Sequence, residues 1–485
     1  MTKELRRLSI VMLAMFVALF ASTSIIQVAQ AGNLTNTPGN TRALYDSYEI
    51  QRGSIIASGT PIAQSVPADD VYSWQRQYAD AQMWAPVTGY VNAVLDSRTQ
   101  IEDAENTVLS GSGENEFFSR INRAITGQAP RGANVELSLD ANVQRAAWDA
   151  LGGLQGAVVA IEPSTGRILA MVSTPSYDTN ALASHDTDAV NSAYEQLMSD
   201  PSRPMDNRAI AGNLNPPGST FKLVVASAAL ASGKYTPDST FPNVSQYTLP
   251  QSTSVVQNAG GGTCGGGDTV TIATALRLSC NIPMAELAVE LGDDAIRAEA
   301  EKYGFNKQFS MPLTSTASSY PSGLDAAQTA LSGFGQGQVT ATPLQMAMVS
   351  AGIANGGMVM NPRMIDRVIE SDLSVTDERS DSEFGRALDA DLDAQMVSMM
   401  TANVQDGAAS NARIDGVQVA GKTGTAENGA SRPFSLWFTG FAPADDPKVA
   451  VAVVVENGGG QGQSGSGNDI AAPIAKKVME AVLGK

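Results

Sequence analysis

The spacing of apolar and polar residues predicts a series of helices and strands after an apolar N-terminal segment. Residues 8–28 form an uncharged, mostly apolar run. Short apolar runs on both sides of a Ser-Gly pair predict a hairpin within residues 52–63, because turn-forming residues separate two strand-like stretches. Helical patches are expected at residues 90–95 and 117–125.

A second group of elements begins near residue 140. Residues 141–151 have the pattern of a helix, with Asp140 as its N-cap. Residues 156–161 and 168–172 are apolar strands. The Pro and Gly in the segment between them favour a tight connection, so the two strands are predicted to form a hairpin.

The C-terminal part mirrors this pattern. Residues 435–441 and 448–455 predict another hairpin, and residues 469–483 predict an amphipathic helix. Between them, residues 458–467 are rich in Gly and Ser and predict a mobile loop. The order helix, hairpin, mainly helical middle, hairpin, helix indicates an antiparallel sheet, split in sequence, with helices on both faces. The fold class is therefore α/β, in a chain of several domains.

The N-terminal run has the length and flanks of a membrane anchor. A helix over residues 8–28 rises about 31 Å, enough to cross the hydrocarbon core of a bilayer. Lys3, Arg6 and Arg7 precede it, which predicts a cytoplasmic tail over residues 1–7 and export of the rest. A cleaved signal peptide is the alternative, because residues 29–31 read Ala-Gln-Ala. The anchor is favoured because the run exceeds the roughly 7–15 residues of a signal-peptide core.

Composition narrows the classes of function. The 485 residues carry a net charge of -18, which disfavours nucleic-acid binding. Two cysteines and one histidine exclude a four-cysteine or histidine-rich metal site, and neither a metal nor a cofactor is expected. In an oxidising compartment Cys264 and Cys280 are expected to form a disulfide that contributes about 3 kcal/mol. Two buried thiols are the alternative.

The first motif with candidate chemistry is Ser219-x-x-Lys222, which follows Pro-Pro-Gly and opens a strongly apolar helical stretch. Residues at i and i+3 share one helix face, so the two side chains are expected side by side. The helix N-terminus favours developing negative charge on Ser219. A buried Lys222 loses its proton more easily and can act as a base. Alone, the motif is equally compatible with a capping serine and a surface lysine.

Two further motifs follow in order. Ser279-Cys280-Asn281 requires a loop for its first and third side chains to converge. A second match, at residues 466–468, lies in the Gly-rich loop after the third motif and is rejected. The third motif, Lys422-Thr423-Gly424-Thr425, follows an alternating stretch that predicts an edge strand. A glycine in a strand permits close approach of another backbone, which suits a peptide substrate.

Together the three motifs resemble those of the penicillin-binding proteins, the transpeptidases of peptidoglycan. The resemblance extends over nearly the whole chain after the anchor. The hairpin at residues 52–63 is similar to the entry of the N-terminal domain of class B members. Residues 156–170 are similar to the first hairpin of their catalytic domain. The short N-terminal region and the Ser-Cys-Asn variant look most like actinobacterial members.

The resemblance implies a domain layout and a set of ligands. Residues 32–140 would form a small α+β non-catalytic domain, the pedestal or dimerisation domain, and residues 141–485 a transpeptidase domain of the serine β-lactamase and D,D-peptidase type. The substrates would be stem peptides ending in D-Ala-D-Ala, and β-lactams would be inhibitors. Besides the membrane, the partners would be proteins of cell-wall synthesis or division.

The motif residues and the family suggest the same roles. Ser219 would be the nucleophile and Lys222 its base, with Lys422 supplying a positive field that keeps Lys222 neutral. Ser279 would relay a proton to the leaving amine, and Asn281 would position the substrate amide. Thr423, Gly424 and Thr425 would bind substrate, the two threonines at its terminal carboxylate. The backbone N–H groups of Ser219 and Thr425 would form the oxyanion hole.

Other functions are compatible with the same motifs. A D,D-carboxypeptidase differs only in passing the acyl group to water. A β-lactamase or β-lactam sensor of this fold would also be acylated, but a hydrolase needs a carboxylate to activate water, and no segment clearly supplies one. A scaffold with an inactive catalytic domain is disfavoured because all three motifs are intact. His185 lies between Ser184 and Asp186, but adjacent residues cannot form a catalytic triad, so it is read as a surface residue.

Overall fold

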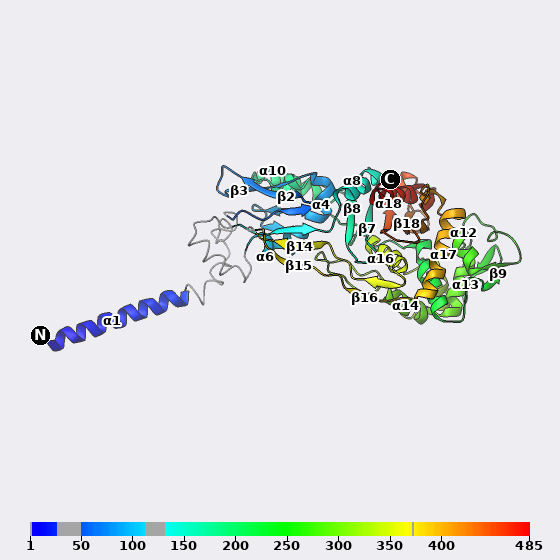
Figure 1. Ribbon diagram of the computed structural model, residues 1–485, viewed down its shortest axis with the longest axis horizontal. Coiled ribbons are helices and arrows are strands. Elements are labelled where there is room, and N and C mark those ends of the chain that lie inside the picture. The colour runs from blue at the N-terminus through cyan, green and yellow to red at the C-terminus, as the bar shows by residue number, and fades with distance from the viewer. Residues whose placement is uncertain (1, 27–49, 112–130, 371–372) are drawn as a thin grey trace.

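The computed structural model describes residues 2–26, 50–111, 131–370 and 373–485 (Figure 1). Its first element is α1 (Thr2–Ser24). Residues 3–24 within it have a mean hydropathy of 1.8 in their most apolar window, and none of that window is buried. The helix therefore has the length and composition of a membrane span. The last two residues of the predicted run, 27 and 28, lie outside the described part of the chain.

The first domain is built on a six-stranded sheet whose strands come from two distant parts of the chain. The predicted hairpin is confirmed, since β1 and β2 are antiparallel with Ala57 opposite Thr60. β6 pairs with β1 in parallel and with β14 antiparallel. The sheet thus extends across the predicted boundary at residue 140. Its strands, in spatial order, are β15 (Val375–Glu378), β14 (Ile365–Ile369), β6 (Asn134–Leu137), β1 (Ile55–Ala57), β2 (Thr60–Pro67) and β3 (Trp74–Tyr78).

One expected helical patch in this domain is wrong. Residues 91–98 instead form a short hairpin, β4 (Val91–Asn92) and β5 (Ser97–Arg98), with Val91 opposite Arg98. Asp96, in the turn between these strands, has a φ of 42°, so the chain does not continue as a helix past residue 95. The patch at residues 117–125 lies outside the described residues. The helices here are α4 (Ala81–Thr88), α5 (Gln100–Ala104) and α6 (Asn106–Leu109).

The second domain contains the predicted split antiparallel sheet. Both hairpins form, and β19 pairs with β7, with Ala452 opposite Val159, so that the two hairpins make one sheet. Every residue of β7 and β19 is buried, as expected for strands covered on both faces. The strands, in spatial order, are β17 (Ala420–Ala426), β18 (Ser435–Ala442), β19 (Val449–Val455), β7 (Gly156–Ile161) and β8 (Ile168–Thr174). β17, which carries the third motif, is an edge strand.

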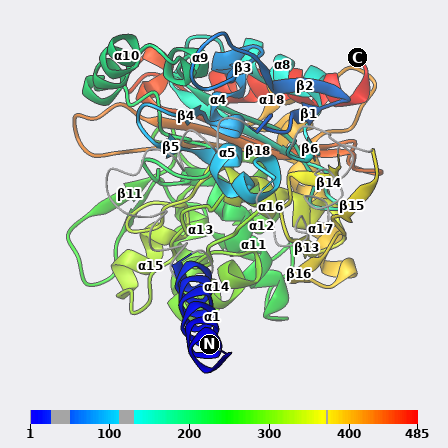
Figure 2. The ribbon, with the colours of Figure 1, turned by 90° about the vertical axis from the view of Figure 1, so that its left-hand side faces the viewer.

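Helices cover both faces of this sheet. Figure 2 shows α8 (Ala141–Leu151) and α18 (Ala472–Leu483) above it and α16 (Pro343–Ala354) with α17 (Ala390–Asp406) below it. Asp140 caps α8 as predicted, because its Oδ1 accepts hydrogen bonds from the backbone N–H groups of Asn142 (2.8 Å) and Val143 (3.2 Å). The predicted C-terminal helix is also present, and a π-helical turn over residues 467–471 leads into α18.

The mainly helical middle segment holds the remaining elements. Two of them, η2 (Gly218–Phe221) and α11 (Lys222–Ala231), carry the first motif. The other helices are α9 (Thr179–Ala183), α10 (Thr187–Ser199), α12 (Ile272–Leu278), α13 (Ile282–Leu291), α14 (Asp293–Lys302) and α15 (Ala326–Ser332). The short strands are β9 (Thr240–Pro242), β10 (Gln246–Thr248), β11 (Val255–Gln257), β12 (Thr269–Thr271), β13 (Met358–Met360) and β16 (Glu383–Arg386).

Candidate active site

Ser219 lies in a 3-10 turn that continues directly into the buried helix α11. Gly218, with φ of 53°, begins the turn, and its backbone N–H donates to the carbonyl oxygen of Gly335 at 3.0 Å. The ring of Phe221, at the end of the turn, packs against Phe305 and Tyr320, with ring centroids 5.4 and 5.7 Å away. The turn is therefore fixed from both ends, and Ser219 stands at the helix start where the sequence predicted it.

Lys222 is fully buried, and its amine contacts one atom each of Ser219, Ser279 and Asn281. Its Nζ lies 2.9 Å from Ser219 Oγ, 2.7 Å from the carbonyl oxygen of Ser279 and 2.8 Å from Asn281 Oδ1. Burial, and next the charge of Lys422, hold the pKa of Lys222 well below its usual value. A neutral amine at this distance can accept the hydroxyl proton of Ser219.

The second motif forms the loop that links α12 to α13. Ser279 ends α12 in a left-handed conformation (φ 62°, ψ 33°), and Asn281 is the N-cap residue of α13. This sharp turn directs the side chain of Asn281 and the carbonyl of Ser279 to the same amine. Between them, Cys280 is joined to Cys264 by a disulfide, with Cα atoms 5.8 Å apart.

Lys422 approaches the site from the sheet side. It is fully buried on β17, and its Nζ donates to Ser279 Oγ at 2.7 Å and to the carbonyl oxygen of Thr423 at 2.9 Å. Burial lowers the pKa of Lys422 to about 7. Among the described residues, neither Lys422 nor Lys222 forms an ion pair with a carboxylate.

The other residues of the third motif contact neighbouring segments of the protein. Thr423 Oγ1 donates to the carbonyl oxygen of Ala408 at 3.1 Å, and Thr425 Oγ1 accepts from the N–H of Gly467 at 3.2 Å. A Cβ on Gly424 would lie 2.9 Å from the carbonyl oxygen of Pro217. The backbone that approaches Gly424 most closely is therefore that of the Ser219 turn itself.

Neither of the two sequence features set aside earlier reaches Ser219, although Gly467 of the second one contacts Thr425. His185, between α9 and α10, packs against the first domain, where its Nδ1 is 2.5 Å from Asp70 Oδ2 and its ring contacts Tyr72. In the rejected Ser-Gly-Asn match, Ser466 accepts from the N–H of Asp469, and Asn468 accepts from the N–H of Asn411. None of these side chains contacts Ser219.

Two residues beside the site were given no role from the sequence, although the segment Gly335-Gln336-Gly337 is similar to one found in the family. Asn258 Oδ1 accepts hydrogen bonds from the N–H groups of both Asn281 (2.9 Å) and Ile282 (3.0 Å). Gln336, with its amide turned to satisfy both groups, pairs with the backbone N–H (2.9 Å) and carbonyl (3.2 Å) of Glu427, just beyond β17. An isolated Asn or Gln has no diagnostic spacing, so only the fold reveals these contacts.

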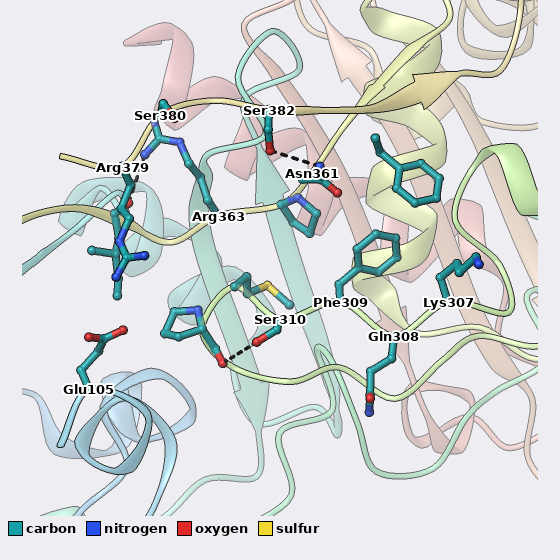
Figure 3. Close-up of a pocket in the computed structure, with 15 residues that line it drawn as sticks. Glu105, Lys307, Gln308, Phe309, Ser310, Asn361, Arg363, Arg379, Ser380 and Ser382 are labelled. Carbon is teal, nitrogen blue, oxygen red and sulfur yellow. Dashed lines mark hydrogen bonds between the residues drawn. The ribbon is translucent and has the colours of Figure 1, made fainter. Parts of the chain in front are cut away.

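A cavity lies apart from this site, between the two domains. Figure 3 shows a cavity of about 600 Å³ between Glu105 of the first domain and residues of the second, including Lys307, Phe309, Arg363 and Arg379. Its lining contains none of the residues of the three motifs. The candidate active site is therefore defined by its side-chain chemistry rather than by cavity size.

Comparisons with known proteins agree with this geometry. Residues 156–480 match the family described as the penicillin binding protein transpeptidase domain, and residues 52–135 match the penicillin binding protein A dimerisation domain. The peptidoglycan D,D-transpeptidase PbpA of Mycolicibacterium smegmatis is 41% identical over 100% of this chain and 99% of its own length. PbpA of Mycobacterium tuberculosis is 39% identical over the same shares.

The fold of this chain is also similar to those of solved structures. Penicillin-binding protein A from M. tuberculosis, as its penicillin G acyl-enzyme complex, has a TM-score of 0.85 at 39% identity, covering 90% of this chain and 100% of that chain. Its imipenem acyl-enzyme complex has a TM-score of 0.86 with the same identity and coverage. With the three motifs gathered around one serine, the chain belongs to the penicillin-binding protein transpeptidase family.

Proposed function

We propose that this protein is a peptidoglycan D,D-transpeptidase that works through an acyl-enzyme on Ser219 and is inhibited by β-lactams. The observation that carries the proposal is the buried Lys222 amine, 2.9 Å from Ser219 Oγ and 2.8 Å from Asn281 Oδ1, without a carboxylate partner among the described residues. Kinship with D,D-transpeptidases over the whole chain supports the same reaction.

In the acylation step, Ser219 Oγ attacks the carbonyl of the penultimate D-Ala while its proton moves to Lys222 Nζ. The backbone N–H groups of Ser219 and Thr425 bind the oxyanion, and losing one such donor typically costs about 3–4 kcal/mol. The C–N bond then breaks, and the terminal D-Ala leaves with a proton relayed by Ser279. Lys422 Nζ donates a hydrogen bond to Ser279 Oγ at 2.7 Å and stabilises the negative charge that develops on this hydroxyl.

Substrate binding falls to residues around this centre. Asn281 holds the peptide amide, and the hydroxyls of Thr423 and Thr425 bind the terminal carboxylate together with the charge of Lys422. Gly424 leaves room for the Ser219 turn to meet the strand. The amine of a second stem then attacks the ester, which forms the cross-link and frees Ser219.

The N-terminal helix supports a location of both domains outside the cytoplasm. The apolar helix α1 supports a single membrane span, and Lys3, Arg6 and Arg7 at its start support a cytoplasmic N-terminus. Both domains would then lie outside the cytoplasm, where peptidoglycan is cross-linked and where the disulfide of Cys264 and Cys280 is stable. The first domain, at residues 32–140, would contact proteins of cell-wall synthesis or division.

Intact-mass analysis after penicillin G treatment tests the nucleophile. We expect one adduct, mapped by peptide digestion to Ser219, and none in Ser219→Ala. Ser466→Ala is the matched control, because it removes the serine of the rejected motif, and it should label like the unaltered protein. Labelling of Ser219→Ala at the unaltered level would refute the assignment. Incubation with a stem pentapeptide and an acceptor amine then separates transpeptidation, which gives a cross-linked product, from carboxypeptidation, which gives only free tetrapeptide.

A further inference from the structure

A second cavity lies between the first domain and the segment of residues 183–185, and its ionisable lining residues are all basic. Its volume is about 190 Å³, below that of most drug-sized ligand pockets. Arg52, Arg76, Arg98 and His185 line it, and no described lining residue is acidic. Such a lining stands out in a chain with a net charge of -18. It points to an anionic ligand.

A single carboxylate, that of Glu102, forms ion pairs with two of these guanidinium groups. The Nε atoms of Arg52 and Arg76 each lie 2.6 Å from an oxygen of Glu102, whose side chain is fully buried. One negative charge cannot neutralise two positive charges, so this cluster retains a surplus of positive charge. Buried surplus charge is unfavourable without a counter-charge.

Arg98 adds a further positive charge that is weakly neutralised. Its nearest carboxylates, Asp96 and Asp103, are 3.9 and 3.8 Å away, with side chains 73% and 64% exposed. Exposed pairs at these distances contribute little. Together with the surplus beside Glu102, about two positive charges remain for a ligand to neutralise.

Two of the guanidinium nitrogens lack acceptors as well as counter-charge. Arg76 is only 6% exposed, and its Nη2 is buried with no hydrogen-bond partner, as is Nε of Arg98. Buried polar atoms nearly always have partners, so such orphan donors call for an explanation. A ligand with several acceptor oxygens would satisfy them after small rotations of the two side chains.

We propose that this cavity binds a phosphate group carrying two negative charges. A phosphate monoester has close to two negative charges and three strong acceptor oxygens, which match the remaining positive charge and the unpaired donors. The planar guanidinium forks suit this geometry. The group could come from the head group of a phosphomonoester lipid or from a soluble phosphate compound. This site shares no residue with the three catalytic motifs, so it does not depend on the proposed function.

Calorimetric titration of the full chain in zwitterionic nanodiscs with inorganic phosphate tests the proposal. We expect saturable binding that weakens at least roughly tenfold in Arg98→Gln. Arg98 does not contact Glu102 and is partly exposed, so this variant should fold. The matched control is Arg145→Gln, which removes another partly exposed arginine paired with Asp80 and should leave phosphate affinity unchanged. The rate of acylation by penicillin should be unaltered in both variants, which verifies that each is folded.

A second arm identifies the source of the phosphate. Adding phosphatidate to the nanodiscs should weaken the affinity for inorganic phosphate if the lipid head group occupies the cavity, and leave it unchanged if the natural ligand is soluble; either result supports the site. Absence of saturable binding in the phosphatidate-free nanodiscs would overturn the proposal. Equal affinity in Arg98→Gln and the unaltered protein would overturn it too.

Discussion

At the scale of single residues, the reactivity of Ser219 depends on two lysines that share one buried site. Like charges in one low-dielectric site oppose each other, so the site favours one protonated and one neutral amine. Burial and the charge of Lys422 both lower the pKa of Lys222. Burial alone lowers the pKa of Lys422, to about 7. Lys222 therefore loses its proton more readily than Lys422, which is what its proposed role as the base requires.

This difference predicts a bell-shaped pH profile for acylation. The rate should rise with pH as Lys222 loses its proton, and fall as Lys422 loses its own near pH 7. The second-order rate constant for a fluorescent penicillin, measured across pH, checks this. Lys422→Arg supplies the comparison, because an arginine stays protonated; any remaining activity should lack the descending limb. A rate that stays level through pH 7 in the unaltered protein would contradict this account.

A second residue-scale prediction concerns Asn258, which positions Asn281 without touching the serine. Asn258→Ala leaves the two backbone N–H groups of Asn281 and Ile282 without an acceptor, at a cost of about 1–3 kcal/mol. We expect acylation to slow about tenfold or more. Asn258→Asp keeps the acceptor oxygen but turns a carboxylate oxygen toward the Gly262 carbonyl, so its rate should fall less than that of Asn258→Ala. Equal rates in the two variants would show that the acceptor does not matter.

At the scale of elements, the site exists because β17 and the Ser219 turn meet almost backbone to backbone. A Cβ at residue 424 would lie 2.9 Å from the carbonyl oxygen of Pro217 and 3.1 Å from the Cβ of Trp437. The carbonyl cannot move easily, because Trp437 Nε1 donates to the neighbouring carbonyl of Pro216 at 2.9 Å. Gly424 thus sets the spacing between the lysine-bearing strand and the nucleophile.

Gly424→Ala should therefore push β17 away from the turn and impair acylation more than stability. We expect at least a tenfold loss in acylation rate, with a change in the free energy of unfolding of about 1–3 kcal/mol, the usual cost of overpacking. Gly153→Ala is the control, since a Cβ there meets nothing within 4 Å. Denaturant unfolding and penicillin labelling measure the two effects. Normal labelling of Gly424→Ala would disprove the spacing role.

The elements that were predicted correctly are those with a local sequence pattern. Continuous apolar runs and turn residues identified both hairpins of the catalytic sheet, because each hairpin is a local unit with its own turn. The hairpin at residues 91–98 was missed, since Tyr90, Val91 and Leu95 also fit a helical spacing. Contacts between distant segments carry no local pattern. The bonds of Asn258 and Gln336, and the pairing of β14 with β6, therefore appear only in the structure.

At the scale of the whole molecule, the two domains share a sheet rather than a simple linker. β14 and β15 leave the catalytic domain, join the sheet of the first domain beside β6, and return, so the first domain is completed by residues 365–378. Val368 of β14 is 4% exposed and lies opposite Val135 of β6. Opening this pairing would expose the core of the first domain. The two domains should therefore unfold together.

A charged residue in β14 tests this coupling. Val368→Asp buries an unpaired carboxylate and should destabilise the protein by roughly 3 kcal/mol or more. Val375→Asp, on neighbouring β15 at a position 48% exposed, should change stability by less than about 0.5 kcal/mol. Thermal unfolding is followed by penicillin binding and by the fluorine NMR signal of Trp84, which is buried in the first domain, in protein labelled with fluorotryptophan at its natural tryptophan positions. The two signals should fall together, and in Val368→Asp both should move to lower temperature, because the loss of one sheet removes support from the other. If the Trp84 signal changes well before penicillin binding is lost, the domains unfold independently and the shared sheet does not couple them.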